Sequence, residues 1–182
     1  MNLYLSLINM TKIKDKIIIF DANLLLVFIL GLNNQSREIN HPRSNKYKLK
    51  HSKALKELFD YWSPLIIIGP VLIETFHLLK NPASKKQKIP PDNLISLYRI
   101  FLDNHAFKEE RVEIEKVIND NRINKLGLTD TSIIHLVKNL IKRDSNEIAV
   151  VSDDKELIKE INELNIETYF FDAKGSLCSS KN

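Results

Sequence analysis

The sequence predicts an α/β fold with three layers, α/β/α, in which helices cover both faces of a central, mostly parallel sheet. Three short runs of apolar, largely β-branched residues lack alternating polar positions, which is typical of strands buried on both faces, and a fourth run, IETYFF, is expected to be a last strand. The first three are each followed by residues with helical spacing, and strands that alternate with helices form parallel sheets. The strands are expected at 16–20, 64–70, 147–152 and 166–171.

The first half of the chain contains two of these strands. Its expected elements are a strand at 16–20, a helix or a buried turn with a helix at 23–32, a loop at 33–50, a helix at 51–62, a strand at 64–70 and a helix at 71–79. The loop is predicted because 33–50 is polar and basic. Pro70 suits the first turn of the helix that follows the second strand.

The second half contains the other two strands. Its expected elements are a loop at 81–92, a helix at 93–102, a charged helix at 109–121, a break at Gly127, an amphipathic helix from Thr129 or Asp130 to about Ile141, a strand at 147–152, a helix at 153–164 and a strand at 166–171. Asp92 is a suitable cap for the first of these helices. No linker divides the chain, so we expect one domain over 1–182, with a core at about 16–171 and flexible ends at 1–12 and 173–182.

Composition and charge limit the class of protein. The chain is 43% hydrophobic and 27% charged, which is typical of a soluble globular protein. The apolar run 17–32 is shorter than the roughly 20 residues of a membrane-spanning helix, and it contains Asp21, so no membrane partner is expected.

The only cysteine, Cys178, cannot form an internal disulfide, which indicates the cytoplasm. The net charge is +4; the basic segments 33–56 and 80–88 are either solvated loops or contacts for a polyanion.

Acidic residues stand where the expected strands end. Asp21 directly follows the first strand, Asp153 and Asp154 follow the third, Glu74 lies one turn into the helix after the second, and Asp130 begins a helix. Side chains at such positions meet in the crevice beyond the carboxyl ends of parallel strands. Taken singly, each acid is more simply a helix cap or a surface residue. Asp21 is different, because apolar residues flank it on both sides and capping alone explains it poorly.

Several acids at one edge of a sheet would repel one another and raise each other's pKa unless a cation neutralised them. Carboxylate oxygens suit Mg²⁺ or Mn²⁺, which also accept phosphate oxygens. Such ions can activate a water and stabilise the leaving oxygen in phosphodiester cleavage. The acids therefore predict a metal site that acts on a phosphate ester.

Four segments together resemble the acidic motifs of PIN-domain ribonucleases, the fold of VapC-type toxins. The segments are IIIFDAN, GPVLIETFHLL, LGLTDTSIIHLV and AVVSDDKEL, in that order. Asp21 and Asn23 match the family's Asp-x-Ser/Thr/Asn, and Glu74 matches its helical glutamate. Asp130 matches Leu-x-x-x-Asp-x-x-Ile, while Ser152 and Asp154 match Thr/Ser-x-Asp-x-x-Leu. The chain is longer than a compact PIN domain, mainly in 33–50 and 81–125.

The resemblance implies a metal-dependent endoribonuclease whose acids Asp21, Glu74, Asp130 and Asp154 hold Mg²⁺ or Mn²⁺. Asp153 falls on a variable position of the pattern and could share this task. Asn23, Ser152 and the neighbouring Thr129 would orient the ligands or the attacking water. The implied partners are RNA, single-stranded or structured, an antitoxin protein if the chain is the toxin of a toxin–antitoxin pair, and a second copy of the chain.

Two other interpretations stay open. Phosphatases of the haloacid-dehalogenase type also place an aspartate after their first strand, which would make Asp21 a nucleophile. They use Asp-x-Asp there, whereas this chain has Asn23. The third interpretation is a PIN-like module that binds RNA without catalysis, with its acids acting as caps. His135, on the helix of Asp130, is expected to be structural.

Overall fold

A computed structural model describes residues 15–33, 47, 49–80, 99, 107–143, 146–171 and 177–179. Its centre is a six-stranded sheet with the strand order β3-β2-β1-β4-β5-β6, in which β6 is antiparallel to β5 and every other pair is parallel. The strands are β1 (Asp15–Phe20), β2 (Leu65–Ile68), β3 (Phe107–Glu110), β4 (Asn146–Ser152), β5 (Glu167–Phe171) and β6 (Leu177–Ser179). The predicted mostly parallel sheet is confirmed.

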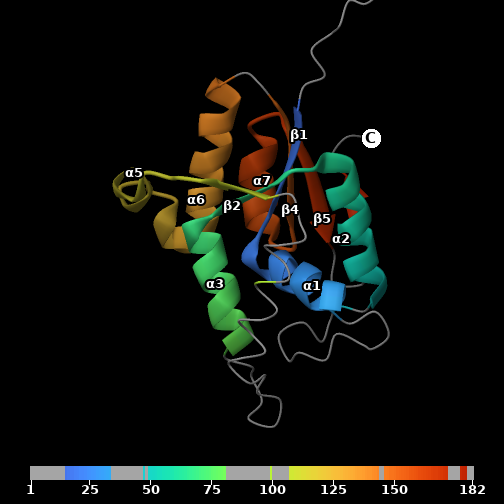
Figure 1. Ribbon diagram of the computed structural model, residues 1–182. Helices are drawn as coiled ribbons and strands as arrows, with labels where there is room; N and C mark the ends of the chain where they lie inside the picture. The colour runs from blue at the N-terminus through green and yellow to red at the C-terminus, as the bar shows by residue number, and fades with distance from the viewer. Residues whose placement is uncertain are drawn as a thin grey trace, which may run out of the picture.

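Helices cover both faces of this sheet. They are α1 (Ala22–Asn33), α2 (Leu49–Trp62), α3 (Gly69–Lys80), α5 (Ile114–Ile118), α6 (Ile123–Lys142) and α7 (Lys155–Asn162). Figure 1 shows α6 and α7 on one side of the sheet and α2 on the other, while α1 and α3 lie toward the end at which β1 finishes. The α/β/α layering predicted from the sequence is therefore confirmed.

β1 is the central strand, and its register decides what lies at the end of the sheet. It pairs with β4 over its whole length, from Asp15 opposite Asn146 to Phe20 opposite Val151. The next residues along the two strands, Asp21 and Ser152, are consequently neighbours. On the other side β1 pairs with β2, with Ile18 opposite Leu65.

Residues 17–32 are almost solidly apolar because β1 and α1 are surrounded by protein. The residues of α1 from Leu24 to Leu30 are all buried, and α1 packs against both α2 and α3. Burial on every side removes the polar face that a surface helix needs. Among the helices of the described ranges, none is long and apolar enough to cross a bilayer.

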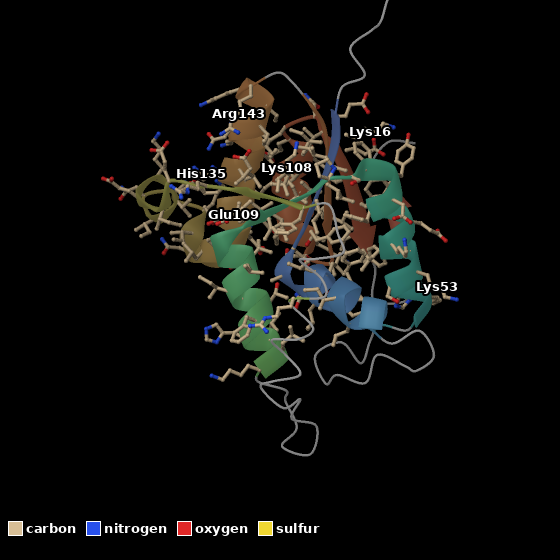
Figure 2. All side chains as sticks on the ribbon, in the orientation of Figure 1. Lys16, Lys53, Lys108, Glu109, His135 and Arg143 are labelled. Atoms are coloured by element: carbon tan, nitrogen blue, oxygen red, sulfur yellow. The ribbon has the colours of Figure 1, made fainter. Side chains whose placement is uncertain are left out.

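The helix expected over 109–121 is wrong in its first part. Phe107–Glu110 forms the edge strand β3, parallel to β2, and α5 begins only at Ile114. Lys108 and Glu109 are exposed on this strand (Figure 2). The short polar strand carries no buried apolar run that could distinguish it from a charged helix. Arg143, after α6, donates to Glu110 Oε1 at 3.0 Å and anchors this edge.

The C-terminal end also differs from the prediction. Flexible residues were expected from 173 onward, but Leu177–Ser179 forms β6, which pairs with β5. Residues 1–12, the helix expected at 93–102 apart from Arg99, the loop at 81–92 and most of the loop at 33–50 lie outside the described residues.

The break expected at Gly127 is confirmed, although helical structure begins earlier, at Ile123. Gly127 has φ 81° and ψ 176°, a backbone conformation that essentially only glycine adopts. The kink separates a first helical turn from the long helix that contains Asp130.

We expect Gly31→Ala to destabilise the protein, because a Cβ at this position of α1 would lie 2.1 Å from Ser52 Cβ on α2. Overpacking of this kind costs about 1–3 kcal/mol, whereas glycine to alanine inside a helix is otherwise favourable. The measurement is the free energy of unfolding in urea.

Gly69→Ala is the matched control, since a Cβ there meets no atom within 4 Å. Its free energy of unfolding should stay within about 1 kcal/mol of the wild-type value. Equal stabilities for the two variants would contradict the close approach of α1 and α2.

Candidate functional site

A cavity of about 280 Å³ lies at the carboxyl ends of the central strands, and the four acids of the predicted site line it. Its lining residues are Asp21, Ala22, Asn23, Glu74, Leu126, Gly127, Leu128, Thr129, Asp130 and Asp154. The acids come from four separate places in the chain: the end of β1, α3, α6 and the start of α7. The fold therefore brings together side chains that are distant in sequence.

Asp21 is the most buried of these acids, at 4% exposed. Its Oδ1 accepts a hydrogen bond from the backbone N–H of Leu24 at 2.7 Å. Its Oδ2 accepts from the Ser152 hydroxyl and from the backbone N–H of Asp153, the latter at 3.1 Å. Asp21 thus caps α1, the role that the sequence analysis considered a poor explanation, and it also joins β1 to the end of β4.

Ser152 connects Asp21 to Asp154. Its hydroxyl donates to Asp21 and accepts a hydrogen bond from the backbone N–H of Asp154 at 2.9 Å. Asp154 Oδ1 in turn accepts from the N–H groups of Glu156 and Leu157, at 2.7 and 3.0 Å, and so caps α7. Ser152 therefore links the carboxylate of Asp21 to the backbone of Asp154.

Glu74 and Asp130 reach the cavity from helices. The Thr75 hydroxyl donates mainly to Val71 O within α3 at 2.7 Å, and it also lies 3.3 Å from Ala22 O. Thr75 thus packs α3 against the start of α1, beside Glu74. Asp130 follows the kink at Gly127 by three residues. Among the described residues, neither Glu74 nor Asp130 accepts a hydrogen bond, so both carboxylates remain available to a ligand in the cavity.

The pKa of Asp130 is raised to about 7 by burial and by the charges of Asp154, Glu74 and Asp153, in that order. The pKa of Asp21 is also raised, first by burial and then by Asp153, although hydrogen bonds from Ser152 and Leu24 oppose the shift. A cation in the cavity would lower the pKa of both residues, because it stabilises their charged forms. The electrostatics of the cavity therefore favour a bound cation or a retained proton.

Asp153 does not line the cavity, although the sequence analysis included it among the possible metal ligands. Its carboxylate accepts hydrogen bonds from Asn23 Nδ2 at 3.3 Å and from the Tyr47 hydroxyl at 2.5 Å. Asp153 therefore holds Asn23, which does line the cavity. The geometry gives it a positioning role beside the site.

Tyr47 is a neighbour of the site that the sequence analysis did not single out. It is buried and its ring lies edge-on to His51, with 5.8 Å between centroids. Burial raises the pKa of Tyr47, and the hydrogen bond to Asp153 raises it further, so the hydroxyl stays protonated and donates. The feature of the sequence that could have identified Tyr47 is its position as an aromatic residue inside the basic segment NKYKLK.

The donor set fits a hard divalent cation, with one restriction. In the described part of the chain, no three His, Cys, Asp or Glu side chains stand close enough to hold one ion directly. Mg²⁺ needs only one or two carboxylate ligands, because it keeps several of its waters. Asp130 and Glu74 fit this requirement best, since both Asp21 oxygens already accept hydrogen bonds.

The described part of the basic segment 33–56 does not border the cavity. Lys53 projects from α2 on the side of the molecule away from α3 and α6 (Figure 2), and Lys56 pairs with Asp60 at 2.7 Å. The other cations of this segment, apart from Lys50, and those of 80–88, apart from Lys80, lie outside the described residues. His135 contacts Asp120 at 2.8 Å beside α5, away from the cavity.

The chain matches no family model, no curated protein and no solved structure. Similarity to the PIN-domain ribonucleases therefore remains a prediction from the four motifs.

Without divalent ions, we expect the melting temperature to fall as the pH rises from about 4 to about 7. The unfolded chain releases the Asp130 proton near its ordinary pKa of 3.8, whereas the folded protein holds it up to about 7. The stabilisation from this proton is complete below pH 4 and is lost as the pH rises. Mg²⁺ should raise the melting temperature on the order of 5 °C near pH 7.5 and less near pH 5, where it competes with protons.

Differential scanning fluorimetry with and without Mg²⁺ measures this effect. Asp130→Asn should flatten the pH dependence and reduce the shift caused by Mg²⁺. Asp60→Asn, on the exposed face of α2, should behave as wild type. An Asp130→Asn protein with the wild-type response to Mg²⁺ would exclude Asp130 from the ion site.

Proposed function

We propose that this chain is a metal-dependent endoribonuclease with a PIN-type site. The observation that supports the proposal is that Asp21, Glu74, Asp130 and Asp154 line one cavity at the carboxyl ends of parallel strands. These are the four positions at which the sequence resembles the acidic motifs of that family. Mg²⁺ or Mn²⁺ would supply an activated water and would stabilise negative charge on the phosphate during hydrolysis.

In this proposal the residues of the chain divide into two groups. Asp21 and Asp154 are fixed by backbone hydrogen bonds at the starts of α1 and α7, so they define the shape of the site. Asp130 and Glu74 face the cavity without such bonds and are the groups that adapt to a ligand. The raised pKa of Asp130, about 7 in the metal-free protein, reflects a crowding of acids that a bound cation would relieve.

Hydrolysis of the RNA chain replaces one P–O bond with another and moves one proton. The oxygen of water forms a bond to phosphorus and one P–O ester bond breaks. The proton released by the water goes to a carboxylate of the site, and the departing ribose oxygen takes up a proton in exchange. The chain would contribute by positioning its carboxylates around the scissile phosphate. The ends of β1 and β4 fix Asp21 and the start of α7 fixes Asp154, whereas Glu74 and Asp130 approach from α3 and α6.

A module that binds RNA without catalysis is the second candidate. Asp21 and Asp154 both cap helices, which is the structural role that this candidate assigns to them. The phosphatase interpretation has less support, because Asn23 stands where those enzymes use a second aspartate, and because it assigns no role to Glu74, which lines the same cavity. The toxin role, the antitoxin partner, the homodimer and the cytoplasmic location stay predictions.

We expect Asp130→Asn and Glu74→Gln to reduce kcat for Mn²⁺-dependent cleavage of single-stranded RNA at least about 100-fold, as loss of a catalytic carboxylate does. Both substitutions preserve size and remove charge at positions without a structural hydrogen bond, so the melting temperature should not fall. The measurement is cleavage of a short RNA labelled with a fluorophore and a quencher.

Asp60→Asn is the matched control and should cleave at the wild-type rate. Because all variants are purified identically, a contaminating ribonuclease would give every preparation the same activity. Unchanged cleavage in both Asp130→Asn and Glu74→Gln would exclude the nuclease. RNA binding without cleavage by the wild type would favour the binding module.

A further inference from the structure

An exposed ion pair joins two segments that form walls of the acidic cavity. Lys125 Nζ contacts Glu156 Oε2, and the two side chains are 52% and 53% exposed. Lys125 directly precedes Leu126, Gly127 and Leu128, which line the cavity. Glu156 lies in the first turn of α7, two residues after Asp154. The ion pair therefore stands at the edge of the candidate site.

The ammonium group of Lys125 also lies within the electric field of the cavity. Its pKa is raised first by the hydrogen bond to Glu156, and the charges of Glu156, Glu160 and Asp154 add to the shift. Asp154 is one of the four acids that line the cavity. Because Lys125 directly precedes the lining residue Leu126 and contacts Glu156 beside Asp154, its positive charge can act on an anion that approaches these acids.

Beside the metal ion of the proposed function, a basic side chain at the edge of the cavity would attract the phosphates on either side of the scissile one. Arg122, which is near Lys125 in the chain, is already committed, because its guanidinium donates to both oxygens of Asp120 and lies 3.8 Å from Glu160. Within the described ranges, the one ion-pair partner of Lys125 is Glu156, which is itself exposed. Exposed ion pairs add little stability, so Lys125 can exchange Glu156 for a phosphate at small cost.

We propose that Lys125 binds a phosphate of the RNA backbone at the edge of the acidic cavity, and that Glu156 occupies Lys125 when no RNA is bound. This inference rests on the proposed function and adds a substrate-binding residue to it. Lysine serves here as a flexible point charge, which suits a contact that carries no base specificity. Glu156 then acts as a competitor of the substrate.

A purely structural role for the ion pair makes a different prediction. If the pair only ties the first turn of α6 to α7, removing either partner disturbs the cavity wall in the same way. If Lys125 passes from Glu156 to a phosphate, removing Lys125 weakens RNA binding and removing Glu156 strengthens it. The two halves of one ion pair therefore distinguish the two roles by the sign of their effects.

The test uses the full chain with Lys125→Ala, Glu156→Gln and the double variant. We expect Lys125→Ala to raise KM about three- to tenfold with little change in kcat, and to reduce the slope of log Kd against log salt by about 1, as loss of one phosphate contact does. Glu156→Gln should lower KM about two- to threefold, but only while Lys125 is present. Binding of a fluorescein-labelled single-stranded RNA, with Ca²⁺ in place of Mn²⁺, gives Kd by anisotropy.

Lys116→Ala and Glu113→Gln are matched controls, because these residues form an exposed ion pair at 2.8 Å on α5, outside the cavity lining. They correct for the general effect of changing the net charge. The proposal is overturned if Lys125→Ala and Glu156→Gln change KM in the same direction, or if Glu156→Gln helps equally without Lys125. A wild-type chain that binds the RNA and does not cleave it contradicts the proposed function alone, and the order of Kd values still tests Lys125.

Discussion

The buried carboxylate of Asp21 is the interaction on which the rest of the site depends. A charge or a polar group without partners is costly inside a protein, and Asp21 is 4% exposed among apolar neighbours. It is stabilised by donors from Leu24, Ser152 and Asp153. Each donor belongs to a different part of the fold: the first turn of α1, the end of β4 and the segment before α7. Satisfying this one carboxylate therefore fixes β1, β4 and α1 relative to one another.

The candidate site combines a rigid framework with buried acids that lie close to one another. Parallel pairing of β1 with β4 holds Asp21 and Ser152 side by side, and the Gly127 kink directs the helix of Asp130 to the same cavity. Burial, and after it the charges of nearby acids, raise the pKa values of Asp21 and Asp130, which lowers stability near neutral pH in the absence of a cation. A fold that needed only stability would place such groups apart, so the arrangement favours a functional role for the cavity.

Sequence patterns predicted the buried elements better than the exposed ones. The apolar runs of β1, β2 and β4 are short and rich in β-branched residues, which favours buried strands, and their alternation with helices implies a parallel sheet. β3 carries Lys108 and Glu109 on an exposed edge, so the pattern had no apolar signal and resembled a charged helix. β6 consists of three residues, Leu177–Ser179. It forms by pairing with β5, and a segment this short has no local sequence pattern that predicts a strand.

The sequence by itself determined that four acids follow buried strands or begin helices, and therefore that they could meet at one edge of a parallel sheet. The motif pointed to Asp154 and left open whether the adjacent Asp153 shares its task, and only the tertiary structure decided that Asp153 does not line the cavity. Asp154 caps α7 beside the cavity, while Asp153 is turned to Asn23 and Tyr47. The reason is physical: neighbouring side chains leave the end of a strand in different directions, and the direction of each depends on partners that are remote in the chain.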